Sequence, residues 1–183
     1  MIRREVTLFF TILIINILVL TMIEENSLIK NGVLRVAELM AVSAKTAPKA
    51  KGVDNIRVLV LSTPEELENL AKGMEELSSK YGEFLVRDAD NVRNSETVVL
   101  IGAKKMDFGL KSPPEIDINL CMTLVNLGIA VGSAVKTASI LNVDNRIMIS
   151  IGYAAKELGL IDADYILGIP LSAKGKNIYF DRK

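Results

Sequence analysis

The stretch LGIAVGSAVKTAS, residues 127–139, lies inside the longest helix candidate of the chain, Asp117 to about Leu141. This segment is apolar nearly all round, and Gly128, Gly132 and several alanines and serines bring small side chains at four-residue spacing. Small residues at this spacing on a helix allow another backbone to approach closely. We therefore predict a long central helix whose small residues pack inside one core, or against a ligand or a second subunit.

Buried strands and further helices are predicted on both sides of this segment. Continuous apolar runs of strand length indicate strands covered on both faces, and Thr63 with Glu66 has the pattern of a capping box at a helix start. We expect strands at residues 56–61, 84–86, 97–101 and 165–169, helices at 26–46, 63–80 and 146–158, and a loop at 103–116. Because helices separate the strands, the pattern predicts an α+β fold in which some strands pair in parallel.

The first segment of the chain differs from the rest. Arg3 and Arg4 precede the uncharged residues 6–23, which meet the lower length limit of a membrane helix. The segment is interpreted as a membrane anchor, as an artefact of an upstream start site with Met22 as the natural start, or as a buried core element. We therefore expect a hydrophobic extension over residues 1–21 and a single α+β domain over residues 22–183. The protein is expected to be cytoplasmic, or membrane-anchored through residues 6–23.

The composition excludes several kinds of chemistry. The chain of 183 residues has 22 basic and 22 acidic side chains, so no basic excess indicates nucleic acid as a partner. It has no histidine, which removes Ser-His-Asp catalysis and histidine-ligated metal sites. Its single cysteine, Cys121, cannot form a disulfide within the chain, and its apolar surroundings predict a buried structural thiol. No pair of carboxylates stands out as an acid/base couple, so no catalytic residue and no metal ligand is assigned.

Two basic segments are the strongest candidates for ligand binding. KTAPKAKG, residues 45–52, surrounds a predicted helix end, and SAKGKN, residues 172–177, follows the last strand with Arg182 beyond it. Lysines next to flexible backbone suit a phosphate group, although solvated loops have the same composition. Neither segment has the spacing of a phosphate-binding Walker loop. The candidate cofactor-binding residues are Lys45, Thr46, Lys49, Lys51, Lys174, Lys176 and Asn177.

Four long segments together resemble one prokaryotic family. They are AKTAPKAKGVDNI, FLVRDADNVRNSETVVLIGAK, LGIAVGSAVKTASILNVDNRIM and ILGIPLSAKGKNIYFDR, in this order, within residues 24–182. The family consists of uncharacterised ferredoxin domain-containing proteins, found largely in archaea and anaerobic bacteria. Its members usually carry several cysteines after the VVLIG strand, of which only Cys121 has a counterpart here. The resemblance therefore implies a divergent member in which an iron–sulfur cluster is unlikely, because a cluster needs several thiolate ligands.

The chain is also similar to flavin nitroreductases in a weaker way. The similarity lies in Ala47-Pro48 after a helix, in the small-residue helix, and in Gly168-Ile169-Pro170 followed by lysines. It implies a nitroreductase-like mixed sheet flanked by helices, a homodimer, and FMN with its phosphate among the candidate lysines. A redox partner protein would then supply or receive electrons. The alternative is a non-catalytic binding protein that keeps the fold, and the sequence does not decide between the two.

Overall fold

A computed structural model describes residues 23–180 of the chain. The chain divides into two compact units, residues 1–32 and 33–183, and each is described by itself. In the first unit the described residues contain the start of helix α2 (Glu25–Thr46), which continues into the second unit. Apart from Ile23, the predicted extension and membrane anchor lie outside the described residues. The single domain expected over residues 22–183 stays a prediction.

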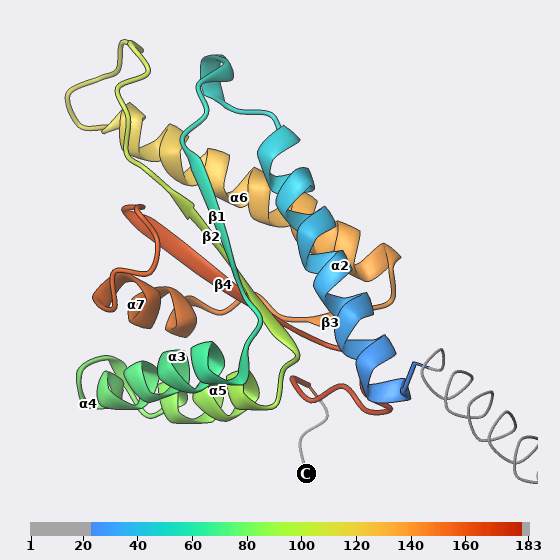
Figure 1. The fold of residues 1–183 in the computed structure, drawn as a ribbon. Helices are drawn as coiled ribbons and strands as arrows, with labels where there is room; N and C mark the ends of the chain where they lie inside the picture. Colours follow the sequence, from blue (N-terminus) through green and yellow to red (C-terminus); the bar gives the residue numbers. More distant parts are fainter. Residues whose placement is uncertain (1–22, 181–183) are drawn as a thin grey trace, which may run out of the picture. The chain divides into compact units, whose positions relative to one another are not determined.

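The second unit is built on a four-stranded sheet in the order β1-β2-β4-β3 (Figure 1). The strands are β1 (Ile56–Leu61), β2 (Thr97–Ala103), β3 (Asp144–Asn145) and β4 (Tyr165–Ser172). Every residue of β2 is buried, which confirms the expectation of a strand covered on both faces. β4 continues beyond the predicted end at residue 169, because Pro170 still pairs with Val98 of β2.

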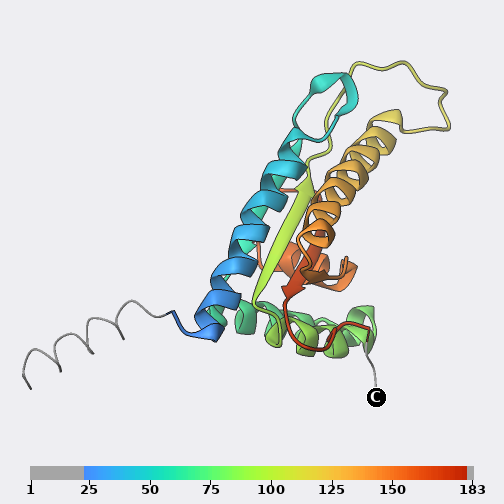
Figure 2. The ribbon, with the colours of Figure 1, turned by 90° about the vertical axis from the view of Figure 1, so that its right-hand side faces the viewer.

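Helices cover both faces of the sheet, as Figures 1 and 2 show from two directions. The remaining helices are η1 (Ala50–Gly52), α3 (Pro64–Glu76), α4 (Ser78–Tyr81), α5 (Phe84–Arg93), α6 (Ile118–Ile140) and α7 (Ile149–Glu157). From Val33 onward, α2 packs with α6 against one face, where Ile101 and Ile169 are fully buried. Helices α3, α5 and α7 cover the other face around Leu100. The α+β fold and the long central helix are therefore confirmed.

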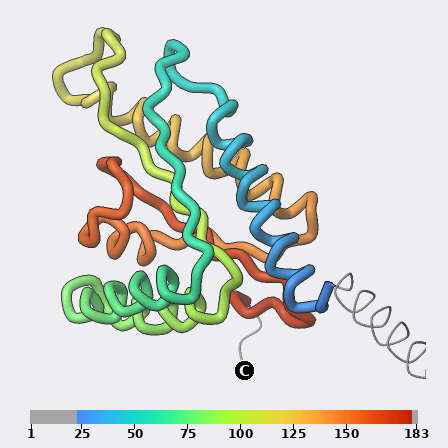
Figure 3. The backbone as a smooth tube through the Cα atoms, viewed as in Figure 1, coloured from blue at the N-terminus to red at the C-terminus, as the bar shows by residue number. Residues whose placement is uncertain are grey.

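The expected parallel pairing is wrong, because all pairs among the described strands are antiparallel. Between β1 and β2 the chain forms α3 and α5, which pack side by side and return it to the end of the sheet where β1 finished. The tube in Figure 3 shows the same return between β2 and β4, where α6 and α7 run in opposite directions. Two helices between strands, rather than one, reverse the direction of the next strand.

The strand predicted at residues 84–86 is also wrong. These residues begin α5, whose buried positions are Leu85, Asp88, Ala89 and Val92, a spacing of three and four residues. Asp88 is a buried carboxylate on this helix, and the buried Ser150 of α7 donates a hydrogen bond of 2.7 Å to it. The three apolar residues of the predicted strand begin an amphipathic helix. Three residues are too few for periodicity to distinguish a helix from a strand.

The predicted capping box at the start of α3 is present. The backbone N–H of Glu66 donates to Thr63 Oγ1 at 3.2 Å, and the Glu66 carboxylate accepts from the backbone N–H groups of Thr63 and Ser62 at 2.9 Å each. These backbone hydrogen bonds lower the pKa of Glu66. A carboxylate whose pKa is lowered by folding contributes stability above its unfolded pKa and loses that contribution as the pH falls through its folded pKa.

Replacing Thr63 by alanine should lower the free energy of unfolding by about 1 kcal/mol, because one backbone N–H at the start of α3 loses its acceptor. Urea denaturation at neutral pH measures this loss. The Glu66→Gln variant should be less dependent on pH between about 5 and 3 than the natural chain, since its side chain does not titrate. An identical pH dependence in both proteins would contradict the assignment.

Candidate functional site

A cavity lies where α6, α7 and β4 meet. Its volume is about 320 Å³, within the range of small-ligand sites. It is lined by Leu124, Leu127 and Gly128 of α6, Ile149, Gly152, Tyr153 and Lys156 of α7, and Asp164, Tyr165, Ile166 and Leu167 at the start of β4. Most of these side chains are apolar, so the cavity suits a flat or apolar group that meets a few polar contacts.

The cavity exists because one side of β4 is only partly paired. On that side β3 reaches only Leu171 and Ser172, and a bridge joins Gly168 to Met148. The backbone N–H and C=O of Gly168 both bond to Met148, so they point away from β2. Strand residues alternate in direction, and the peptide groups of Ile166 therefore point to the same side, toward the cavity. The backbone groups at the start of β4 therefore lie on the side of the strand that borders the cavity, where the Ile166 oxygen faces Gly152 of α7.

A lysine and a carboxylate stand at one end of the cavity. Lys156 Nζ donates to the backbone oxygen of Ala163 at 2.7 Å and lies 3.8 Å from Asp164 Oδ1. The other Asp164 oxygen accepts from the backbone N–H of Lys105 at 2.8 Å. The ring of Tyr153 stacks on Tyr81 with centroids 4.3 Å apart, which fixes its orientation. The cavity therefore combines apolar walls, an oriented aromatic ring, a cation and an anion.

Gly152 allows α7 to lie directly on β4. A Cβ atom at this position would come within 2.0 Å of the backbone oxygen of Ile166. A side chain here would push α7 away from the strand and reshape the cavity. At Gly175 the corresponding space is open, so a methyl group there meets nothing within 4 Å.

We expect Gly152→Ala to lower the free energy of unfolding by roughly 1–3 kcal/mol, the usual cost of overpacking against a backbone that cannot move freely. Gly175→Ala is the matched control, because it adds the same methyl group in open space. Chemical denaturation of both variants measures the difference. Equal stability of the two would contradict the close contact between α7 and β4.

The first basic segment lies at the end of α2. Lys45 forms an ion pair with Asp54 and donates to the backbone oxygen of Ile56 at 2.9 Å. Lys49 donates to the backbone oxygens of Lys45 and Ala47 at 2.6 and 2.8 Å, and thereby caps the helix. Thr46 Oγ1 donates to Val42 within the helix at 3.0 Å. These three side chains mainly complete the end of α2.

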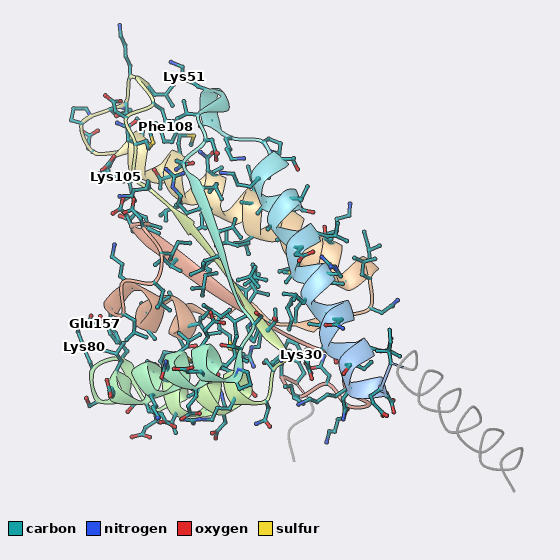
Figure 4. All side chains as sticks on the ribbon, in the orientation of Figure 1. Lys30, Lys51, Lys80, Lys105, Phe108 and Glu157 are labelled. Carbon is teal, nitrogen blue, oxygen red and sulfur yellow. The ribbon has the colours of Figure 1, made fainter. Side chains whose placement is uncertain are left out.

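Lys51 has a different position from its neighbours. Its backbone has a positive φ of 52°. Its ammonium group lies near Gly109 in the loop that precedes α6. In Figure 4 the labelled side chain of Lys51 lies at the same end of the sheet as those of Lys105 and Phe108. It makes no hydrogen bond or ion pair with another residue in the described part of the chain. Among the four candidates of this segment, Lys51 is best placed to meet a ligand.

The second basic segment lies at the opposite end of the sheet. Lys174 donates to the backbone oxygen of Asn94 and lies 3.9 Å from Glu96, and Asn177 Oδ1 accepts from the backbone N–H of Tyr179 at 3.0 Å. Lys176 is exposed. β4 starts opposite Ala103 of β2 and ends opposite Thr97, so the second basic segment, which follows β4, lies at the Thr97 end of the sheet. The first basic segment precedes β1, which starts opposite Ala103, and so lies at the other end. One chain by itself does not bring the two segments together.

Sequence reasoning missed the residues that line the cavity at α7 and β4. Tyr153, Lys156 and Asp164 belong to no motif, and only the fold brings them beside α6. The small-residue helix was the one available signal, because it was interpreted as a surface against which a ligand or subunit could lie, and Gly128 does line the cavity. The expectation of a buried Cys121 is wrong: this thiol is exposed in the first turn of α6. Residues 23–180 contain no group of three acidic or cysteine side chains that could hold a metal.

The fold is that of nitroreductases. Over 78% of both chains it superposes on a nitroreductase with bound FMN from Desulfitobacterium hafniense, with a TM-score of 0.56 and 16% sequence identity. A BluB-like flavoprotein from Clostridium difficile gives a TM-score of 0.54 and 18% identity over 81% of this chain and 84% of that one. Nitroreductase A from Vibrio parahaemolyticus gives 0.55 and 11% identity, and 78% of this chain spans only 60% of that longer protein. At these identities the likeness concerns the fold alone.

Sequence comparison identifies the family. The chain is 41% identical over 180 residues to an uncharacterized protein from Archaeoglobus fulgidus, with 88% of this chain and 97% of the relative covered. Residues 118–182 match the family described as uncharacterized proteins containing a ferredoxin domain (DUF2148). The chain therefore belongs to this family, and its own fold is nitroreductase-like.

Proposed function

We propose that this protein binds FMN and acts as a redox protein, with the flavin ring in the cavity between α6, α7 and β4. The observation that carries the proposal is this apolar cavity at the incompletely paired side of β4, with Tyr153 and Lys156 in its wall. The structural relatives support it, because one has bound FMN and another is an NADPH:FMN oxidoreductase from Vibrio harveyi.

The residues present fit a flavin ring. Its flat surface is apolar, and its edge carries carbonyl and N–H groups that need hydrogen-bond partners. Leu124, Leu127 and Ile149 supply apolar contact, and Lys156, Asp164 and the Ile166 backbone supply donors and an acceptor. When bound, FMN would supply the electron and hydride chemistry. The chain itself would hold and orient the ring and keep water away from it.

The phosphate would be held by the two basic segments, Lys45, Thr46, Lys49 and Lys51 with Lys174, Lys176 and Asn177. Because the two segments lie at opposite ends of the sheet in one chain, both can contact the same phosphate only in a homodimer. The first segment lies beside Asn126 of α6, whose Oδ1 accepts from Ala50 N at 2.8 Å. The second lies beside the other end of α6, since Asn177 and Ser139 line one polar cavity. Two copies packed with antiparallel α6 helices would bring the first segment of one copy toward the second segment of the other.

A non-catalytic binding protein that keeps the fold is the second candidate function. The observation that favours it is the single exposed thiol, Cys121, in a family described by a ferredoxin domain. A chain that has lost its cluster could still bind a redox partner protein in the cytoplasm, through the surface around Cys121. Metal analysis of the protein tests this candidate, because stoichiometric iron would contradict the loss of the cluster on which it rests.

The purified protein should bind FMN with a micromolar dissociation constant, measured by quenching of flavin fluorescence. Lys156→Met should weaken this binding by about tenfold, because a cation at the ring edge is lost while the length of the side chain is kept. The double variant Lys51→Gln, Lys176→Gln should weaken it by at least as much, because both basic segments would lose a charge. Lys72→Met, on α3 and away from the cavity, is the control and should bind as the natural protein does. Binding weaker than millimolar in the natural protein would remove the proposal.

A further inference from the structure

The cavity between α6, α7 and β4 has an aromatic side chain in its wall that is held from behind. Tyr153 of α7 lines this cavity, whereas Tyr81, the last residue of α4, is not among the described residues that line it. The two rings stack with their centroids 4.3 Å apart and an angle of 17° between their planes. Tyr81 therefore covers one face of the Tyr153 ring from outside the cavity, and the rest of the Tyr153 ring borders the space for a ligand.

Tyr81 is itself held on its second face. Lys80 Nζ lies over the Tyr81 ring, 4.9 Å from its centroid. Because Tyr153 occupies one face of this ring, the ammonium group covers the other, where the electrons of the ring attract a cation. The pKa of Lys80 is raised, first by the Tyr81 side chain and less by Glu157 of α7, and Figure 4 shows Lys80 and Glu157 near each other. Lys80, Tyr81 and Tyr153 thus form three layers that join α4 to α7.

The backbone that carries Tyr153 is also fixed. The preceding residue, Gly152, lies directly on β4, because a Cβ atom there would come within 2.0 Å of the Ile166 oxygen. The remaining freedom of Tyr153 is rotation of its side chain, and the stack with Tyr81 restricts that rotation. A ligand that contacts a ring already held in place does not have to order the ring when it binds, so less conformational entropy is lost.

We propose that Tyr153 makes the cavity prefer a flat aromatic ring to a saturated ring of the same carbon skeleton, and that Tyr81 is a positioning residue that acts through Tyr153. The inference rests on the cavity of the proposed function and names the contact that selects the ring. Stacking of two aromatic rings adds to the free energy gained by burying apolar area. A saturated ring buries apolar area as well but cannot stack. Apolar walls alone therefore give no preference for the flat ring.

A matched pair of probes tests this preference without FMN. Naphthoate and decalin carboxylate share one carbon skeleton and one carboxylate, which meets Lys156 in the wall of the cavity. The natural protein should bind naphthoate about fivefold more tightly than decalin carboxylate, measured by titration calorimetry. Tyr153→Leu should lose this preference, and Tyr153→Phe, which keeps a ring, should retain it. Equal affinity of the natural protein for the two probes, or binding of neither, would overturn the inference.

A double-mutant cycle tests the role of Tyr81. Tyr81→Leu should weaken naphthoate binding by about threefold, because the ligand must then order the Tyr153 ring, and Tyr81→Phe, which can still stack, should restore the affinity. In a Tyr153→Leu background, Tyr81→Leu should have no further effect. Phe84→Leu is the matched control, because Phe84 and Tyr81 are each 38% exposed and Phe84 makes no ring contact with Tyr153. The same weakening in both backgrounds, or in the control, would overturn the positioning role.

Measurements with FMN separate this inference from the proposed function. A natural protein that prefers naphthoate through Tyr153 but binds no FMN would overturn the proposed function and leave the role of Tyr153 standing. If the natural protein binds FMN, Tyr153→Leu should bind it about fivefold more weakly. Natural affinity for FMN in Tyr153→Leu would overturn the inference and leave the proposed function standing.

Discussion

The pairing of β4 is the constraint on which the second unit depends. Along one side this strand pairs with β2 over its whole length, from Tyr165 opposite Ala103 to Leu171 opposite Thr97. Along the other side it pairs only near its end and at Gly168. Pro170, which has no N–H, is tolerated because its backbone nitrogen points to the same incompletely paired side as Gly168. The remaining part of that side is where a cavity can form between helices on opposite faces.

Helix α6 meets two demands at once. Its inner side is held by specific contacts: Asn126 donates to Asn55 Oδ1 at 2.9 Å and accepts from Ala50 N, and Thr137 shares a hydrogen bond of 2.7 Å with Ser43. Its outer side is apolar and exposed, which is unusual for a surface over such a length. Polar contacts thus hold α6 to α2, to η1 and to the residue before β1, while its other side remains available as a wall of the cavity.

Local signals in the sequence predicted local structure well. The capping box at Thr63, the buried strand at residues 97–101 and the long helix after Asp117 are each specified by residues close in sequence, since hydrogen bonds and hydrophobic spacing within one element decide them. The strand predicted at residues 84–86 was wrong because three residues are too few to separate a period of two from one of 3.6. The parallel pairing was wrong because the packing of α3 against α5, which reverses the chain, involves residues distant in sequence.

The sequence by itself determined the kinds of chemistry available to this protein: no histidine, one thiol, two lysine-bearing turns and a long helix rich in small residues. It could not determine which of these groups meet. Lys156 and Asp164 join Leu124 in one cavity only because α6 and α7 pack on opposite faces of β4, and the two basic segments are separated by the length of the strands. Composition is a property of the chain alone, whereas a site requires distances between residues far apart in sequence, and those distances are set by the packing of the sheet.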